Sequence, residues 1–430
     1  MQKISPRIQS LSQSSLQSIY NKSQLSNGIR VVSEEIPHVR SISFGVWMNV
    51  GSRDENETNN GISHFLEHMV FKGTKHNTAK QIARSLESVG GYLNAFTSKE
   101  HTCFYARILD DQLPKAVDVI SELVQCPIFD KKEIEKEKQV VLEELKNLED
   151  DPDDLIHDYF DSHIYHKHPL GYPVIGKAEN IKSFTKGKLR DYIRRHYVPD
   201  RMVVAAAGNC KHEKVVELVE RYFHGNRHNG TIKRESVSHR QRQTKEVYEK
   251  PIMQAHVCMG TRSFSIKNRM RYPLLVLNTL LGEGMSSRLF QNIREKYGFA
   301  YSIYSFANLL SDAGNFGIYI GTDVHNIENS IDLITKELDK LKSKPVSEAE
   351  LKRTKEQVKG ALMLSLESMS NRMMRLGSGE LYFERYSPID DIVRNIDAVQ
   401  QEDMYGVATK LFQIENFSTV IFKPQNSSAS

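Results

Sequence analysis

The sequence predicts an α+β fold of two related α/β-sandwich domains, each a mostly antiparallel sheet packed with helices. The chain has 430 residues, whereas a single hydrophobic core seldom serves more than about 250–300 residues. Strand and helix patterns follow one another in a similar order in both halves. Between the halves, residues 224–246 are polar and basic and lack hydrophobic periodicity, which is typical of an inter-domain linker.

The first half contains the clearest strand signals. Residues 29–32 and 42–50 are apolar runs typical of strands. The segment GGYLNAFTSKEHTCFYARI alternates on both sides of a turn at Ser98 and Lys99, which predicts a β-hairpin. Hydrophobic spacing predicts helices at residues 64–72, 79–89, 114–125 and 131–149.

The second half repeats this order. Strands are predicted at residues 254–260, 300–306 and 315–321, and helices at residues 274–281, 287–296, 327–341 and 347–367. We therefore divide the chain into an N-terminal arm (1–26), a first domain (27–223), a linker (224–246) and a second domain (247–430).

The first 26 residues have a composition of their own. They include Lys3, Arg7 and Lys22, eight serines and no acidic residue. This composition resembles a mitochondrial presequence and lacks the continuous apolar stretch of a secretory signal. The alternative, which we favour, is a disordered or loosely docked arm. We accordingly expect a cytoplasmic protein, with the mitochondrial matrix as the alternative compartment.

Composition argues against several classes of protein. The formal net charge of +4 is small for this length, and no basic cluster is interleaved with aromatic residues, so nucleic-acid binding is not expected. No stretch approaches the about 18–20 consecutive apolar residues of a membrane-spanning helix. The four cysteines show no C-x-x-C spacing, which favours reduced thiols over disulfides or a sulfur-ligated metal.

The most informative motif is H-x-x-E-H, formed by His64, Glu67 and His68. Residues i and i+4 of a helix lie one turn apart, so both imidazoles can bind one metal ion, with Glu67 beside them. In inverted zincins, two neutral imidazoles and a third protein ligand hold Zn²⁺ and leave one position for water. Glu67, which is not a ligand, would take a proton from that water and pass it to the leaving amine.

The same three residues could also form a polar stripe on a surface helix. Against this alternative, apolar residues at 65, 66 and 69–71 give the segment a core-facing side, and buried histidines need polar partners. We expect Ser63 to cap this helix and Gly73 to end it.

A third ligand is expected from the helix at residues 131–149. Its Glu137 and Glu144 are spaced i, i+7 and share one helical face. Most glutamates in this charged run are expected to be solvated and paired with lysines. Glu144 is the candidate ligand.

With these motifs, the chain resembles the pitrilysin/insulinase family of zinc peptidases over residues 27–424. In that family the third ligand lies 76 residues after the second histidine, which is Glu144 here, and a supporting carboxylate lies seven residues earlier, which is Glu137. The flanking string GSRDENETNNGISHFLEHMVFKGT is most similar to single-chain bacterial members and to the catalytic subunit of mitochondrial processing peptidase. The resemblance implies one Zn²⁺ per chain and two domains enclosing a substrate chamber, with the metal only in the first.

The resemblance also implies how a peptide would be held. Residues 92–96 match the family's substrate-pairing strand, in which backbone hydrogen bonds bind an extended peptide. Asn94, Ala95 and Phe96 would lie beside the scissile bond. Without the resemblance, Asn94 could equally be a polar residue near a turn.

A pair in the second half, Arg294 and Tyr301, matches residues on the far wall of the family's chamber. There the pair contacts the substrate backbone, and the tyrosine can help to stabilise the tetrahedral oxyanion. The alternative is an arginine on a helix surface and a tyrosine on a strand.

Two further acidic residues, Asp154 and Asp158, follow the third candidate ligand. Acidic residues at these positions in processing-peptidase relatives hold an arginine near the cleavage site through paired charge and hydrogen bonds. The alternative is that Asp154 belongs to a helix start, with Asp151 as the cap and Pro152 at the first helical position.

Two functional classes follow from these motifs. The first is a zinc metalloendopeptidase that cleaves short or unfolded peptides, including peptides with basic residues near the cleavage site, and that forms a homodimer or a heterodimer with an inactive paralogue. The second is a noncatalytic scaffold or peptide-binding subunit of a processing-peptidase-like complex. Loss of a ligand or of the base would mark the second class. All four residues are present, which favours the enzyme.

Overall fold

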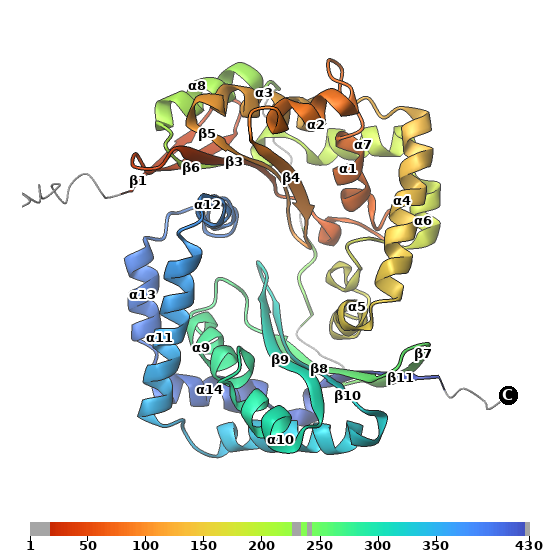
Figure 1. The fold of residues 1–430 in the computed structure, drawn as a ribbon, viewed down its shortest axis with the longest axis vertical. Helices are drawn as coiled ribbons and strands as arrows, with labels where there is room; N and C mark the ends of the chain where they lie inside the picture. The colour runs from red at the N-terminus through yellow and green to blue at the C-terminus, as the bar shows by residue number, and fades with distance from the viewer. Residues whose placement is uncertain (1–17, 226–233, 239–242, 426–430) are drawn as a thin grey trace, which may run out of the picture.

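The structure is a computed structural model that describes residues 18–225, 234–238 and 243–425. Two sheets, each covered by helices, occupy the upper and lower parts of the molecule (Figure 1). This arrangement confirms the predicted α+β class. None of the described helices is long and apolar enough to cross a lipid bilayer.

The first sheet has six strands among the described residues, in the order β1-β2-β6-β3-β5-β4. Neighbouring strands are antiparallel except for β2 and β6, which are parallel. The strand β4 therefore forms one edge. The strands are β1 (Ile19–Gln24), β2 (Arg30–Glu35), β3 (Ser41–Met48), β4 (Tyr92–Thr97), β5 (Thr102–Leu109) and β6 (Met202–Gly208).

The second sheet has five strands in the part of the chain that the structure describes, in the order β7-β11-β8-β10-β9. It too has one parallel pair, β7 with β11, and is otherwise antiparallel. The strands are β7 (Lys245–Lys250), β8 (Ala255–Ser263), β9 (Ala300–Leu309), β10 (Gly314–Thr322) and β11 (Ser418–Pro424).

Helices pack on both sheets, and apolar side chains of strands and helices together form the cores. Phe44 and Phe104 are buried in the first core, and Leu277 and Phe316 in the second. In the first half the helices are α1 (Ile62–Val70), α2 (Ala79–Glu87), α3 (Leu113–Gln125), α4 (Lys131–Glu149), α5 (Pro152–Ile164), α6 (Ala178–Ser183), α7 (Lys186–His196) and α8 (His212–Tyr222). In the second half they are α9 (Arg271–Gly282), α10 (Ile327–Ser343), α11 (Glu348–Ser365), α12 (Met369–Phe383), α13 (Ile389–Asp397) and α14 (Gln401–Leu411).

The two halves exchange helices across their boundary. Helix α12 packs on β2, β3 and β6 of the first sheet, so closely that a Cβ atom on Gly377 would lie 2.1 Å from Nε1 of Trp47. Helix α5 packs on β8 and β11 of the second sheet, where Phe160 is buried with Val420. Each sheet is thus covered in part by a helix from the other half.

Two predicted boundaries differ from the structure. Residues 19–24, assigned to the N-terminal arm, form β1, which pairs with β2 along its whole length. The mostly polar side chains of β1 give no strand pattern in the sequence. Its contacts with distant residues, such as the stacking of Tyr20 on Tyr386 at 4.0 Å, also leave no local signal. Residues 1–17 of the arm lie outside the described residues. Strand β7 begins at Lys245, so its first two residues lie inside the predicted linker. The predicted linker extends too far because the side chains of β7 are mostly polar and exposed.

A buried ion network joins the two halves beside α1. The Arg53 side chain is only 1% exposed, and its Nη1 lies 2.7 Å from Glu100 and 2.6 Å from Asp312. Glu100 lies in the turn between β4 and β5, and Asp312 in the turn between β9 and β10. Nη2 of Arg53 donates to the backbone carbonyl of Glu235 in the connecting segment.

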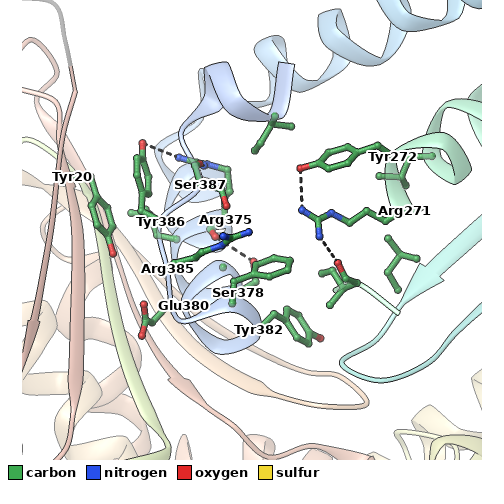
Figure 2. Close-up of a pocket in the computed structure, with 17 residues that line it drawn as sticks. Tyr20, Arg271, Tyr272, Arg375, Ser378, Glu380, Tyr382, Arg385, Tyr386 and Ser387 are labelled. Carbon is green, nitrogen blue, oxygen red and sulfur yellow. Dashed lines mark hydrogen bonds between the residues drawn. The ribbon is translucent and has the colours of Figure 1, made fainter. Parts of the chain in front are cut away.

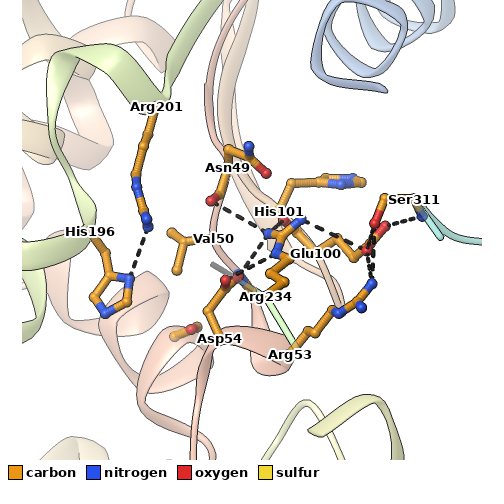
Figure 3. A network of polar contacts seen from close by, with 12 residues as sticks. Asn49, Val50, Arg53, Asp54, Glu100, His101, His196, Arg201, Arg234 and Ser311 are labelled. Carbon is orange, nitrogen blue, oxygen red and sulfur yellow. Dashed lines mark hydrogen bonds and ion pairs between the residues drawn. The ribbon is translucent and has the colours of Figure 1, made fainter. Parts of the chain in front are cut away.

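A second arginine completes the network, as Figure 3 shows. Arg234, also in the connecting segment, pairs with Asp54 at 2.8 Å. It also donates to the backbone carbonyl of Glu100 at 2.7 Å. Both sheets and the segment between them therefore meet at one cluster of charges.

We expect Arg53→Leu to destabilise the protein by about 3–5 kcal/mol, because the buried Glu100 would lose its close cation and keep only Arg234, at 3.8 Å. The measurement is the midpoint of urea denaturation. Arg40→Leu is the matched control, because it removes a solvent-exposed arginine paired with Asp110 and should change the midpoint little. Equal shifts for the two variants would contradict a stabilising role for the buried network.

Candidate metal centre

Helix α1 begins at a tight approach of two backbones. Its N-cap, Gly61, has φ +97°, and a Cβ atom there would lie 2.7 Å from the carbonyl oxygen of Ile175. Ser63, the predicted cap, lies inside the helix instead, and its hydroxyl contacts the Tyr192 hydroxyl at 2.8 Å. The prediction of Ser63 as N-cap is therefore wrong.

The buried carboxylate of Glu55 caps the helix in place of Ser63. It accepts hydrogen bonds from the backbone N–H groups of Gly61 at 2.7 Å and of Ser63 at 2.8 Å. An anion at a helix N-terminus satisfies free N–H groups and interacts favourably with the helix dipole. Burial nonetheless raises the pKa of Glu55.

Helix α1 ends at Val70 rather than near Gly73. Gly73 and Thr74 leave the helix to form single β-bridges with Thr78 and Pro127. These bridges compete with the last helical turn, and the hydrophobic pattern of the sequence could not show them.

The structure brings His64, His68 and Glu144 together. Oε1 of Glu144 lies 3.6 Å from Nε2 of His64, and Oε2 lies 3.5 Å from Nε2 of His68. One potential ligand atom of each residue lies within 4.8 Å of the ligand atoms of the other two residues. These separations are long for hydrogen bonds. Tetrahedral ligands at about 2.0–2.2 Å from zinc are about 3.3–3.6 Å apart, so each of these carboxylate–imidazole distances is compatible with a shared zinc ion.

Glu137 orients one of the candidate ligands. Its Oε1 lies 2.8 Å from Nδ1 of His68, and its Oε2 lies 2.7 Å from Nζ of Lys72. A carboxylate on one ring nitrogen directs the lone pair of the other nitrogen toward the metal. Burial acts to lower the pKa of His68, but the Glu137 hydrogen bond and the nearby Glu144 raise it overall. Burial acts to raise the pKa of Glu137, but His68 and Lys72 lower it overall.

Glu67 is held by a residue of the neighbouring strand. The Thr97 hydroxyl, at the end of β4, donates to Oε2 of Glu67 at 2.6 Å. Helix α1 packs on β4, so the motif lies beside an edge strand. The second carboxylate oxygen of Glu67 has no protein hydrogen bond among the described residues.

The edge strand β4 carries the predicted substrate-binding residues. Asn94 is exposed, Ala95 is buried and Phe96 is half-buried. The side-chain oxygen of Asn94 accepts the backbone N–H of Ala95 at 2.9 Å, while its amide nitrogen donates to the Tyr92 hydroxyl.

Arg294 and Tyr301 both lie on the second half. Arg294 belongs to a π-helical turn, Phe290–Glu295, and its guanidinium stacks on Phe290 at 4.7 Å. Tyr301, on β9, is 60% exposed. In the described part of the chain, neither forms a hydrogen bond or ion pair with the three candidate ligands.

The two predicted specificity residues differ in their surroundings. Asp158 lines a cavity of about 470 Å³ bounded in part by Leu145 and Leu148 of α4, whereas Asp154 does not. Burial raises the pKa of Asp158, and its carboxylate has no ion pair among the described residues. Asp154 is exposed in the first turn of α5, which Asp151 caps as expected.

Three residues at the site escaped the sequence reasoning, namely Glu55, Lys72 and Thr97. Glu55 lies six residues before the helix N-cap, too far for a capping pattern. Thr97 and Lys72 act through partners 30 and 65 residues away, respectively. Only Lys72 has a weak signal, because the predicted helix at residues 64–72 would place it one turn beyond His68 on the same face.

Sequence comparison places this geometry in a known family. Residues 30–178 match Insulinase (Peptidase family M16), and residues 183–358 match the Peptidase M16 inactive domain. A Bacillus subtilis protein named as an uncharacterized zinc protease is 41% identical over 94% of this chain and 98% of its own length. The chain belongs to peptidase family M16. A Streptomyces coelicolor M16 relative with a similar name is 38% identical over 90% of this chain and 86% of its own.

Solved structures agree with this assignment. A protease from Helicobacter pylori superposes with a TM-score of 0.88 at 26% identity, over 95% of this chain and all of its own. A Pseudomonas fluorescens protein described as a peptidase M16 inactive domain gives 0.87 at 20% identity, over 96% of this chain and all of its own. The second likeness shows the fold alone. The family match thus confirms the resemblance to the pitrilysin/insulinase family that was inferred from the sequence.

We expect Glu137→Gln to weaken zinc binding by about 10–100-fold, because second-shell carboxylates fix the orientation of a ligating imidazole. Affinity is measured by competition with a chromogenic zinc chelator. Glu135→Gln is the control, since Glu135 lies on the same helix and pairs with Lys138 instead. Unchanged affinity in the Glu137 variant would contradict the orienting role.

Proposed function

We propose that this M16 protein is a zinc metalloendopeptidase that hydrolyses short or unfolded peptides, with one Zn²⁺ per chain held by His64, His68 and Glu144. The observation that carries this proposal is the convergence of His64, His68 and Glu144, with one ligand atom of each within 4.8 Å of the others, beside the carboxylate of Glu67, which is held in place but is not part of the triad. The names of its relatives support zinc as the metal.

In this proposal Glu67 is the general base and then the general acid. Bound Zn²⁺ would lower the pKa of a water molecule to about 7. Glu67 accepts the proton of the attacking water through its free carboxylate oxygen and delivers it to the leaving amine. The Thr97 hydroxyl holds the other oxygen, which limits rotation of the carboxylate. Glu137 keeps His68 in the tautomer that a metal requires.

The edge strand β4 would hold the substrate in an extended form. An added strand forms backbone hydrogen bonds with any peptide sequence, which suits an enzyme for unfolded peptides. The Ala95 N–H now bonds to the Asn94 side chain, so a bound peptide would exchange this contact for one of its own. The half-buried ring of Phe96 would contact a substrate side chain.

The second half would complete the substrate chamber. Arg294 and Tyr301 are proposed to contact the substrate backbone, with the Tyr301 hydroxyl helping to stabilise the oxyanion. The absence of an ion pair at Arg294, among the described residues, leaves its charge available. Catalysis then requires both halves, and their closure around a peptide could limit turnover.

Assembly and compartment complete the proposal. We propose a homodimer, with a heterodimer containing an inactive paralogue as the alternative, and a cytoplasmic location, with the mitochondrial matrix as the alternative. The competing function is a noncatalytic scaffold or peptide-binding subunit of a processing-peptidase-like complex, without nucleic acid as a partner. The full set of ligand and base residues favours the enzyme.

The decisive experiment compares the native chain with Glu67→Gln. We expect the variant to retain one zinc per chain and to cleave a quenched peptide at least about a hundredfold more slowly, the usual contribution of a general base. Zinc content and initial cleavage rates are the measurements.

The control is Glu57→Gln, which changes an exposed glutamate ten residues earlier and should leave the rate unchanged. A zinc-loaded native chain without activity would instead support the scaffold or a missing partner. A fully active Glu67 variant would exclude Glu67 as the base.

An arginine in the substrate is proposed to bind in the cavity that Asp158 lines. We expect Asp158→Asn to lower kcat/KM about tenfold for a peptide with arginine near the cleavage site, because a charge-assisted pair is lost. The matched substrate carries citrulline, which has the shape of arginine without its charge, and its kcat/KM should not change. Asp154→Asn tests whether the exposed Asp154 also contributes to arginine binding. Equal losses for both substrates would contradict an arginine-binding role.

A further inference from the structure

A cavity lies between α9 and α12, away from the candidate metal centre. Its volume is about 230 Å³, below the about 300–1,000 Å³ of sites for drug-sized ligands, so only a small ligand would fit. Residues from β1, α9, β9, α12 and α13 surround it, and most of its wall is aromatic or aliphatic. These wall residues include Tyr20, Leu275, Leu309, Tyr382, Phe383 and Ile392.

Three arginines line this α9–α12 cavity, namely Arg271, Arg375 and Arg385, and the first two reach it from different helices, as Figure 2 shows. Arg271, on α9, donates to the backbone carbonyl of Ile266 at 2.7 Å and to the Tyr272 hydroxyl at 3.0 Å. Its guanidinium also stacks on Tyr272 at 4.6 Å and on Phe383 at 4.9 Å. Within the described residues, Arg271 has no carboxylate partner.

The second arginine, Arg375 on α12, is also incompletely paired. It donates to the Ser387 carbonyl at 2.7 Å. The nearest carboxylate, Glu34, lies 3.8 Å away and is bound more closely by Arg372, at 2.8 Å. The Arg375 Nε atom is buried and has no hydrogen-bond partner within the described part of the chain.

The one acidic residue in the described wall does not neutralise these arginines. Oε1 of Glu380 is engaged by Lys22 at 2.8 Å and by Arg30 at 3.1 Å. The two cations that pair with Glu380 lie outside the wall of the cavity. The cavity therefore combines an apolar surface with an excess of positive charge.

A glycine keeps part of the space open. Gly379 lies inside α12, and a Cβ atom there would meet no atom within 4 Å. A glycine inside a helix costs about 0.5–1 kcal/mol relative to alanine. Close packing explains the neighbouring Gly377 against Trp47, but no such contact explains Gly379. A side chain at this position would project into the cavity that Gly379 lines.

We propose that the α9–α12 cavity binds a small monocarboxylate with an aromatic or branched aliphatic group. The carboxylate would pair with the guanidinium groups of Arg271 and Arg375, and the apolar group would lie among the aromatic rings. Because β1 belongs to the first sheet and α9 packs on the second, the bound acid would hold the two halves together. The proposal does not depend on peptide hydrolysis.

The first test is calorimetric titration of the full chain with 3-phenylpropionate and, separately, with 3-phenylpropionamide. We expect the acid to bind once per chain with a dissociation constant of about 1 mM or lower. The neutral amide should bind at least about tenfold more weakly, because it lacks the charge that the arginines attract. No binding of the acid, or equal binding of both compounds, would overturn the proposal.

Two variants locate the site. Gly379→Leu fills the cavity and replaces a helix-breaking residue with a good helix former, so it should fold and lose at least about tenfold in affinity for the acid. Gly360→Leu is its control, because Gly360 lies in α11 and its Cβ would also meet no atom within 4 Å. Arg271→Gln should likewise weaken binding, whereas Arg269→Gln, an exposed arginine outside the cavity, should not. Retained affinity in Gly379→Leu would overturn the proposal.

A peptide C-terminus presents the same chemistry as a free acid. The last experiment therefore titrates the Glu67→Gln chain with a pentapeptide ending in phenylalanine and with its C-terminal amide. A free small acid is supported if 3-phenylpropionate binds, if Gly379→Leu abolishes this binding, and if the peptide and its C-terminal amide bind equally. Carboxylate-dependent binding of the peptide without binding of 3-phenylpropionate would overturn it.

Discussion

The buried guanidinium of Arg53 is the contact on which the relation between the two halves depends. It binds one carboxylate from each sheet and a carbonyl of the connecting segment. Removing one partner of a buried ion pair is destabilising, because the other charge is left uncompensated. The cluster therefore positions the turn after β4, and with it the strand that lies beside Glu67, relative to the β9–β10 hairpin of the second half.

The candidate metal centre is built on a crossing of two helices rather than on a loop. Helix α1 supplies two imidazoles one turn apart, and α4 supplies Glu144 as a candidate ligand and Glu137 as its support, two turns apart. Glu55 fixes the start of α1 through backbone hydrogen bonds. Rigid elements hold side chains more closely than loops do, which suits a site whose ligands must meet at tetrahedral spacing.

The exchange of helices between the halves gives the molecule its internal surfaces. Helix α12 covers the first sheet, yet it also lines the α9–α12 cavity. The same helix has Gly377 where contact is closest and Gly379 where space is left. Two positions that are two residues apart in α12 therefore have different roles: Gly377 allows close packing on Trp47, and Gly379 leaves space in the cavity wall.

Much of the site could be predicted because its pattern is local. Helical geometry alone places His64 and His68 on one face, and the same periodicity pairs Glu137 with Glu144. Spacing between the two helices required the family resemblance, since no local rule sets the distance from His68 to Glu144. The hairpin at residues 92–109 was predicted well because its alternation and its turn lie in one continuous segment.

The sequence by itself predicted the fold class, the H-x-x-E-H motif and the hairpin that contains β4, because periodicity and helix geometry act over a few residues. Only the tertiary structure decided that Glu55 caps α1, that β1 joins the first sheet, that α5 and α12 exchange partners, and that Arg53 links both halves. These features depend on contacts between residues far apart in the chain, or on backbone pairing without a side-chain pattern. No local periodicity encodes such contacts, so folding alone brings them together.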